Sequence, residues 1–112
     1  MAAMTADLRA LDAECAQKVM GWEHTSRIGM STHCWYEYGE HVAHDNWSPT
    51  TDIRAAWTLL EKLVADGAVV QLRGYGSMWY ASTDRVPGGT AKQFIAGTAP
   101  LAIVRMALAV KR

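Results

Sequence analysis

The feature that most constrains the fold of this chain is an apolar stripe within residues 53–65. Apolar side chains recur there with the spacing of one face of an α-helix, at Ile53, Ala56, Trp57, Leu60 and Val64. Pro49 keeps the preceding residue extended, Thr51 is a suitable N-cap, and Gly67 can end the helix in a left-handed conformation. The pattern predicts an amphipathic helix that runs to about residue 65, with the Trp57 side chain in the core.

Two further segments have a helical period. The first spans residues 6–20 and ends at Gly21, and its apolar face holds Leu8, Leu11, Cys15 and Val19. The second begins after Thr98, the expected cap, and has Pro100 in its first turn. Its apolar face holds Leu101, Val104 and Leu108. The chain therefore predicts three helices, at its beginning, middle and end.

A hairpin is predicted after the central helix. Residues 68–73 and 77–83 are rich in β-forming side chains and flank Gly74-Tyr75-Gly76, where glycine can adopt a positive φ. Residues 92–96 are a candidate third strand of the same sheet. Val70 and Leu72 fall on one face of the first strand, and Gln71 and Arg73 fall on the other.

Residues 22–46 lose the helical period and predict two short strands, followed by a polar loop over residues 39–47. The order is then helix, two strands, helix, two or three strands, helix. Such an order favours an α+β fold in which an antiparallel sheet is sandwiched between helices. We expect residues 1–112 to form a single domain, since this length is sufficient for one core.

Composition and charge narrow the classes of function. Half of the residues are apolar, a fifth are charged, and the formal net charge is zero. This balance is typical of a globular domain and argues against a disordered chain or a DNA-coating protein. The most apolar stretch, residues 99–110, contains Arg105 and is too short to span a bilayer, and the N-terminus does not resemble a signal peptide. We expect a cytoplasmic protein that binds neither DNA nor membranes.

Enzyme and metal motifs are not found in the sequence. No serine or cysteine lies in a recognised nucleophile motif, and the Gly74–Gly76 turn lacks the Gly-Lys-Ser/Thr of a phosphate loop. Five metal-binding side chains cluster in the sequence, at His33, Cys34, His41, His44 and Asp45. They lack the two tight ligand pairs of a zinc site, so a polar surface loop is favoured. We expect no catalytic residue, no metal and no cofactor.

The aromatic composition points toward binding. The chain has five tryptophans and four tyrosines against one phenylalanine. A nucleotide-binding site needs rings that stack on bases, arginines for phosphates, and polar groups that recognise base edges. The candidate ligand-binding residues of these three kinds are Trp22, Trp47, Trp79, Arg54, Arg73, Arg105, Thr50 and Gln71. The alternative, in which each tryptophan packs at a helix–sheet junction, stays open.

Arg105 stands out among these candidates because it interrupts a helix of alanine, leucine, isoleucine and valine. Its side chain is expected either on the solvent face or in a cavity shared with a partner subunit. An oligomer is expected because one small domain offers little concavity, whereas interfaces form pockets.

Three blocks of sequence together resemble the phage ABA sandwich domain family. The first block is Val19-Met20-Gly21-Trp22. The second covers residues 47–62 and contains Trp47-Ser-Pro-Thr-Thr-Asp-Ile53, Ala56-Trp57 and Glu61-Lys62. The third covers residues 98–105 and contains Thr98-Ala-Pro-Leu-Ala-Ile103 and Arg105. Val104 and Met106 flank that arginine, where a Cys-Arg-Ala-like stretch is expected. The resemblance extends over nearly the whole chain and implies a phage or prophage origin and a helix/sheet/helix sandwich.

The chain also looks like the Thoeris anti-defence sponge proteins. That similarity implies a dimer or hexamer in the cytoplasm of an infected bacterium, which binds cyclic ADP-ribose-type signals, or cyclic oligonucleotides, without cleaving them. Trp22, Trp47 and Arg105 are the favoured ligand residues because they lie within the matching blocks. The alternative is a phage accessory protein that binds a host or phage protein through an aromatic surface; a nucleotide hydrolase is the least favoured class.

Overall fold

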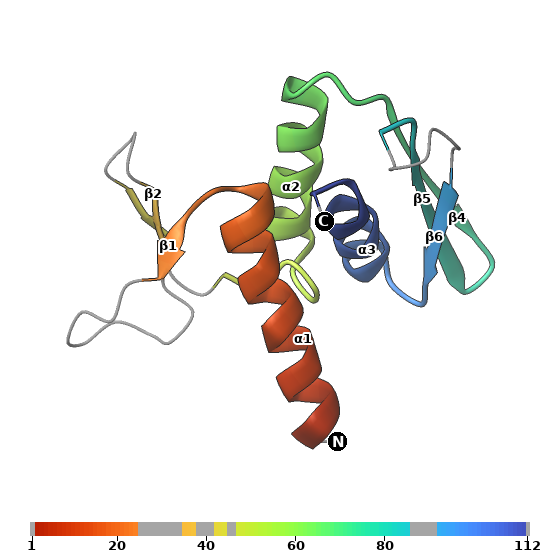
Figure 1. The fold of residues 1–112 in the computed structure, drawn as a ribbon. Helices are drawn as coiled ribbons and strands as arrows, with labels where there is room; N and C mark the ends of the chain where they lie inside the picture. Colours follow the sequence, from red (N-terminus) through yellow and green to blue (C-terminus); the bar gives the residue numbers. More distant parts are fainter. Residues whose placement is uncertain (1, 25–34, 38–41, 45–46, 86–91, 112) are drawn as a thin grey trace.

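The computed structural model describes residues 2–24, 35–37, 42–44, 47–85 and 92–111. Its helical elements are α1 (Ala2–Glu14), the π-helical turn η1 (Cys15–Val19), α2 (Ile53–Ala65) and α3 (Ala99–Lys111). Its strands are β1 (Glu23–His24), β2 (Trp35–Glu37), β3 (Val42–His44), β4 (Val70–Tyr75), β5 (Met78–Thr83) and β6 (Lys92–Ala96). Every strand pairing within these ranges is antiparallel, so the predicted α+β class is confirmed (Figure 1).

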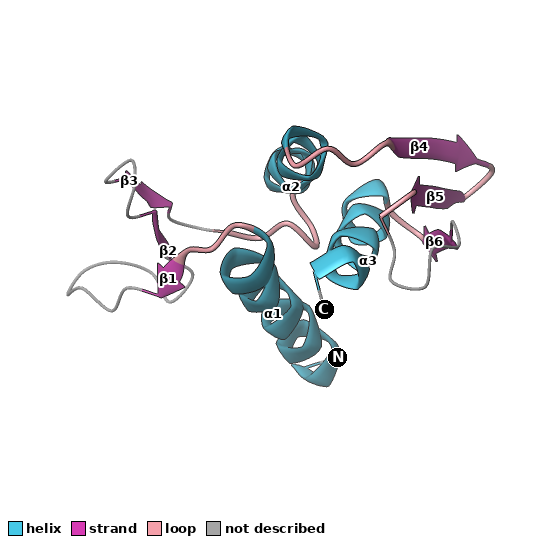
Figure 2. Ribbon diagram, turned by 45° about the horizontal axis from the view of Figure 1, so that its top comes forward, coloured by secondary structure: helices cyan, strands magenta, loops and turns pink. Residues whose placement is uncertain are grey.

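The described strands form two small sheets, with strand orders β1-β2-β3 and β4-β5-β6. The helices lie between these sheets (Figure 2). Helix α3 packs against β4, β5 and β6, α2 packs against α3, and η1 contacts both helices. Among the described elements, the helices therefore cover only one face of the β4–β6 sheet. The other face is called the outer face below.

Helix α3 is the centre of the core because α2, η1 and the sheet surround it. Its buried side chains are Ala102, Ile103, Val104, Met106, Ala107 and Leu108. The predicted cap is confirmed, since the Thr98 hydroxyl accepts a hydrogen bond from the Leu101 backbone N–H. Gly21 also ends the first helical segment as predicted, with a φ of +73°.

Helix α2 forms where predicted but faces the core with a different set of side chains. Its buried residues are Ala56, Leu59, Leu60 and Leu63, whereas Trp57 is 49% exposed. The prediction that Trp57 is a core residue is therefore wrong. The predicted N-cap is also wrong, because the Asp52 carboxylate, and not Thr51, accepts the capping hydrogen bond from the Arg54 N–H.

The predicted hairpin is confirmed with a shift of its turn. Tyr75 pairs with Met78, and Gly76 between them has a φ of +62°. Gly74 instead lies inside β4. Upstream, β3 occupies residues that were predicted to be a polar loop. It pairs with the preceding strand β2, but a strand of three residues is too short to show a recognisable alternation in the sequence.

Candidate functional site

The outer face brings together polar and aromatic side chains from β4 and β5. Side chains alternate between the two faces of a strand. Ala81 is fully buried against the helices, so its pairing partner Leu72 shares that face. Gln71, Arg73 and Tyr75 of β4 must then lie on the outer face, together with Tyr80 and Ser82 of β5.

Arg73 lies in a surface hollow with two tyrosines. The hollow has a volume of about 230 Å³ and is lined by Arg73, Gly74, Tyr75 and Tyr80. Arg73 is paired directly with Tyr80 across the two strands, and Tyr75 follows two residues along β4. The Tyr75 side chain is 80% exposed. The hollow thus combines a guanidinium group with two tyrosine rings, which suits a ligand that has both an anionic and a flat aromatic part.

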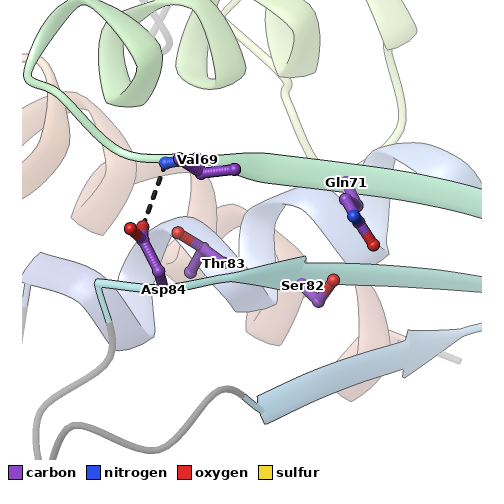
Figure 3. Close-up of a pocket in the computed structure, with 5 residues that line it drawn as sticks. All are labelled: Val69, Gln71, Ser82, Thr83 and Asp84. Carbon is purple, nitrogen blue, oxygen red and sulfur yellow. Dashed lines mark hydrogen bonds between the residues drawn. The ribbon is translucent and has the colours of Figure 1, made fainter.

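A second hollow lies next to the first on the same two strands. It has a volume of about 200 Å³ and is lined by Val69, Gln71, Ser82, Thr83 and Asp84 (Figure 3). Gln71 and Ser82 are direct cross-strand partners, so an amide and a hydroxyl lie side by side. The Asp84 carboxylate accepts a hydrogen bond of 3.0 Å from the Val69 N–H and holds the end of the hollow.

The two hollows together form an elongated surface. Gln71 and Arg73 are two residues apart on one strand, which separates them by about 7 Å. The row from Val69 to Tyr75 spans about 20 Å at the rise of a β-strand. This length exceeds that of a single base and is sufficient for a ligand with several groups.

Trp79 belongs to the same strands but to the opposite face. It pairs with Gly74, and a Cβ atom on Gly74 would lie 3.0 Å from the Trp79 ring. The Trp79 ring therefore packs across β4 only because residue 74 has no side chain. The indole is 37% exposed, so part of the ring stays open to solvent.

Trp22, Trp47 and Thr50 form a separate, buried cluster around Asp12. Trp22 is 4% exposed and Trp47 is 5% exposed. The Trp47 indole N–H donates to the Asp12 backbone carbonyl at 3.0 Å, and the Thr50 backbone N–H donates to the Asp12 carboxylate at 2.8 Å. The expectation that Trp22 and Trp47 offer open stacking faces is wrong, because long-range contacts enclose both rings within the protomer.

The two remaining candidate arginines lie apart from these clusters. Arg54 is exposed in the first turn of α2. Arg105 is exposed on α3, and its guanidinium donates a hydrogen bond to the Ile95 backbone carbonyl of β6. Arg105 therefore lies on the solvent face of its helix, at an edge strand of the same sheet that carries Arg73. Its role in ligand binding stays a prediction.

A scan against protein-family models matches residues 14–108 to the phage ABA sandwich domain. The chain belongs to the phage ABA sandwich domain family. Among solved structures, it is similar to a phage protein from Bacillus cereus ATCC 14579, with 25% sequence identity and a TM-score of 0.62; the match covers 92% of this chain and 90% of that chain. A search of curated proteins found no match.

Some residues of this phage ABA sandwich domain were not among the sequence-based site candidates. Tyr75 was assigned only to a turn, and Ser82 to a strand, although strand alternation places both beside Arg73 and Gln71. Asp12 was not predicted to be structural, because its partners Trp47 and Thr50 are 35 and 38 residues away. No local pattern identifies a contact over that separation.

The described residues of this family member were also compared with the requirements of a metal site and of a membrane-spanning helix. None of its His, Cys, Asp and Glu side chains form a group of three suited to a metal ion. His33, Cys34, His41 and Asp45 lie outside the described residues, and His44 lies in β3. No helix in the described ranges has the length and apolar character needed to cross a bilayer.

Proposed function

We propose that this phage ABA sandwich domain binds a phosphorylated, aromatic small molecule on the outer face of β4 and β5. The single observation that carries the proposal is the Arg73 hollow. A guanidinium beside two tyrosine rings can bind both parts of a nucleotide. The guanidinium can donate charge-assisted hydrogen bonds to a phosphate, and a ring face can stack on the base. The neighbouring amide of Gln71 and hydroxyl of Ser82 supply polar groups for base edges or a ribose.

The finer form of the proposal is a phage anti-defence protein that sequesters a cyclic nucleotide immune signal, of the cyclic ADP-ribose or cyclic oligonucleotide type. The resemblance to Thoeris anti-defence sponge proteins supports this form, and the length of the two hollows fits such a ligand. Sequestration requires tight, stoichiometric binding and no bond cleavage. The site of action is the cytoplasm of the infected bacterium, where such signals are made.

The size of the hollow supports an oligomer. A volume of about 230 Å³ lies below the roughly 300–1,000 Å³ of typical small-molecule sites. A ligand held only by this surface would keep much of its area in water. A further wall from a second copy of the chain would enclose it, which agrees with the predicted homo-oligomer.

A retention assay tests the proposal. Purified protein is incubated with cyclic ADP-ribose isomers, cyclic dinucleotides and cyclic trinucleotides, filtered to remove unbound ligand, and then denatured. Mass spectrometry of the released fraction is expected to show one unaltered nucleotide at near-stoichiometric amount. Altered nucleotide would indicate an enzyme, and absence of uptake across the panel would contradict the proposal.

The second candidate function is binding of a host or phage protein through an aromatic surface. One observation favours it: the outer face also exposes apolar side chains, with Met78 37% and Ile95 43% accessible besides Tyr75. Tyrosine, methionine and arginine are enriched at protein interfaces. Failure of all nucleotides in the retention assay would favour this candidate.

A further inference from the structure

Helix α2 keeps an apolar stripe that no described element covers. Ile53 is 46% exposed, Trp57 is 49% exposed and Val64 is 51% exposed. These residues are four and seven positions apart, so they form one line along the helix, here called the α2 stripe. Leu60 lies on the border between this line and the buried face. The apolar surface of α2 is thus wider than the surface that α3 and η1 cover.

Two opposite charges flank the α2 stripe on the same side of the helix. Arg54 and Glu61 are seven residues apart, which is close to two helical turns and about 10 Å along the axis. Both residues are exposed. Within the described ranges, neither side chain forms an ion pair or a hydrogen bond.

We propose that the α2 stripe is the contact between two copies of this chain, packed antiparallel about a two-fold axis level with Trp57. Such an axis passes midway between Arg54 and Glu61. It therefore brings Arg54 of each copy opposite Glu61 of the other, on the same flank of the contact. The pairing occurs twice and leaves no flanking charge unmatched, as a closed isologous interface requires.

The positions of Arg54 and Glu61 favour a second copy in this orientation over any other partner for the α2 stripe. A parallel pairing of two α2 helices about a two-fold axis would place the charged flanks of the two copies on opposite sides of the contact, so neither Arg54 nor Glu61 would face an opposite charge of the other copy. An unrelated protein would need its own complementary charges at the same spacing, whereas a second copy carries them already. Trp57 lies at the centre, where a large aromatic side chain contributes most to an interface.

The extent of the stripe sets the expected strength of the dimer. Three side chains cover much less than the roughly 800 Å² per partner of a standard stable interface. The dimer should therefore form at micromolar to tens of micromolar concentration and not at nanomolar concentration. The α2 stripe is also distinct from the outer face of β4 and β5, so this inference does not rest on the proposed ligand.

Sedimentation velocity of the full chain tests the inference across a range of about 1–200 µM. The wild-type protein is expected to shift from monomer to dimer within this range. The R54E and E61R variants each place like charges opposite one another, so each should weaken association roughly ten-fold. An R9E variant on α1 is the matched control and should associate like the wild type.

The deciding measurement is an equimolar mixture of R54E and E61R. One chain then carries two flanking glutamates and the other two flanking arginines, so a heterodimer restores both ion pairs. Association of the mixture should recover to the wild-type value, while circular dichroism shows each variant folded. A monomeric wild type, single variants that associate normally, or a mixture that stays weak would each overturn the inference.

Discussion

The indole ring of Trp22 meets that of Trp47 edge-on, with ring centroids 4.6 Å apart and ring planes inclined at 70°. This geometry is favourable for an aromatic pair, and both rings are buried. The pair joins the segment after η1 to the segment before α2, and Trp47 is also anchored to the Asp12 carbonyl. Two residues with the chemistry of base stacking therefore stabilise the fold instead.

Truncation of Trp47 tests this structural role. Trp47→Ala should lower the free energy of unfolding by about 3–5 kcal/mol, because it removes a buried aromatic side chain and its hydrogen bond. Trp57→Ala, on the exposed α2 stripe, is the control and should cost less than about 1 kcal/mol. Urea denaturation at submicromolar concentration, where the α2 contact is not formed, measures both. Equal losses in the two variants would contradict the account.

Substitutions at Asp12 and Thr50 should have contrasting effects on the free energy of unfolding. Asp12→Ala leaves the buried Thr50 N–H without its carboxylate acceptor, which should cost about 1–3 kcal/mol. The Thr50 hydroxyl is buried and hydrogen-bonds to no group in the described ranges. Thr50→Val keeps the shape and removes that hydroxyl, so it should be neutral or stabilising by up to about 1 kcal/mol. A large loss of stability in Thr50→Val would show that the hydroxyl has a role.

The ion pairs of Asp66 should make the stability of the fold depend on pH. A hydrogen bond from Lys111, supported by the charges of Lys111 and Lys62, holds the pKa of Asp66 below the usual 3.8. Because the pKa of Asp66 is lower in the folded protein than in the unfolded chain, its ionised carboxylate stabilises the fold at pH values above the unfolded-state pKa. This stabilisation is lost as the pH falls through the folded-state pKa. Asp66→Asn should therefore lower the urea midpoint at pH 7, and its difference from wild type should fade below pH 3.8. A difference that persists in strong acid would exclude this pairing as its cause.

Arg105→Ala tests the arginine of α3 that contacts the edge of the sheet. Its guanidinium already donates to the Ile95 carbonyl at the edge of β6. We expect this variant to fold normally and to weaken ligand retention by a smaller factor than removal of Arg73. The retention assay, run on both variants with the same nucleotide, gives the comparison. A larger loss in Arg105→Ala would move the ligand toward the β6 edge.

The sequence predicts the helices well because local spacing and end residues determine them. The first helical segment ends at Gly21 and α2 ends before Gly67, because glycine readily adopts the positive φ angles of +73° and +98° found at these two residues. The rotation of α2 is not predictable in the same way. Its apolar residues cover more surface than the core can bury, and packing against α3 selects Leu59 and Leu63 over Trp57.

The candidate site is predictable only in part. Residue type and strand alternation are sufficient to place Gln71 and Arg73 on one face. The burial of Trp22 and Trp47 depends on tertiary contacts, among them the bond from Trp47 to Asp12 across 35 residues of sequence. Membership in a family likewise carries no information about which of its aromatic rings are enclosed.

The proposed function depends on Arg73, which should bind the phosphate of a nucleotide on the outer face. The most direct measurement is a calorimetric titration of the retained nucleotide into wild-type, Arg73→Ala and Arg9→Ala protein. Loss of charge-assisted hydrogen bonds should weaken binding by about 10–100-fold in Arg73→Ala, while Arg9→Ala, on α1, binds like the wild type. Unchanged affinity in a folded Arg73→Ala protein would contradict the account.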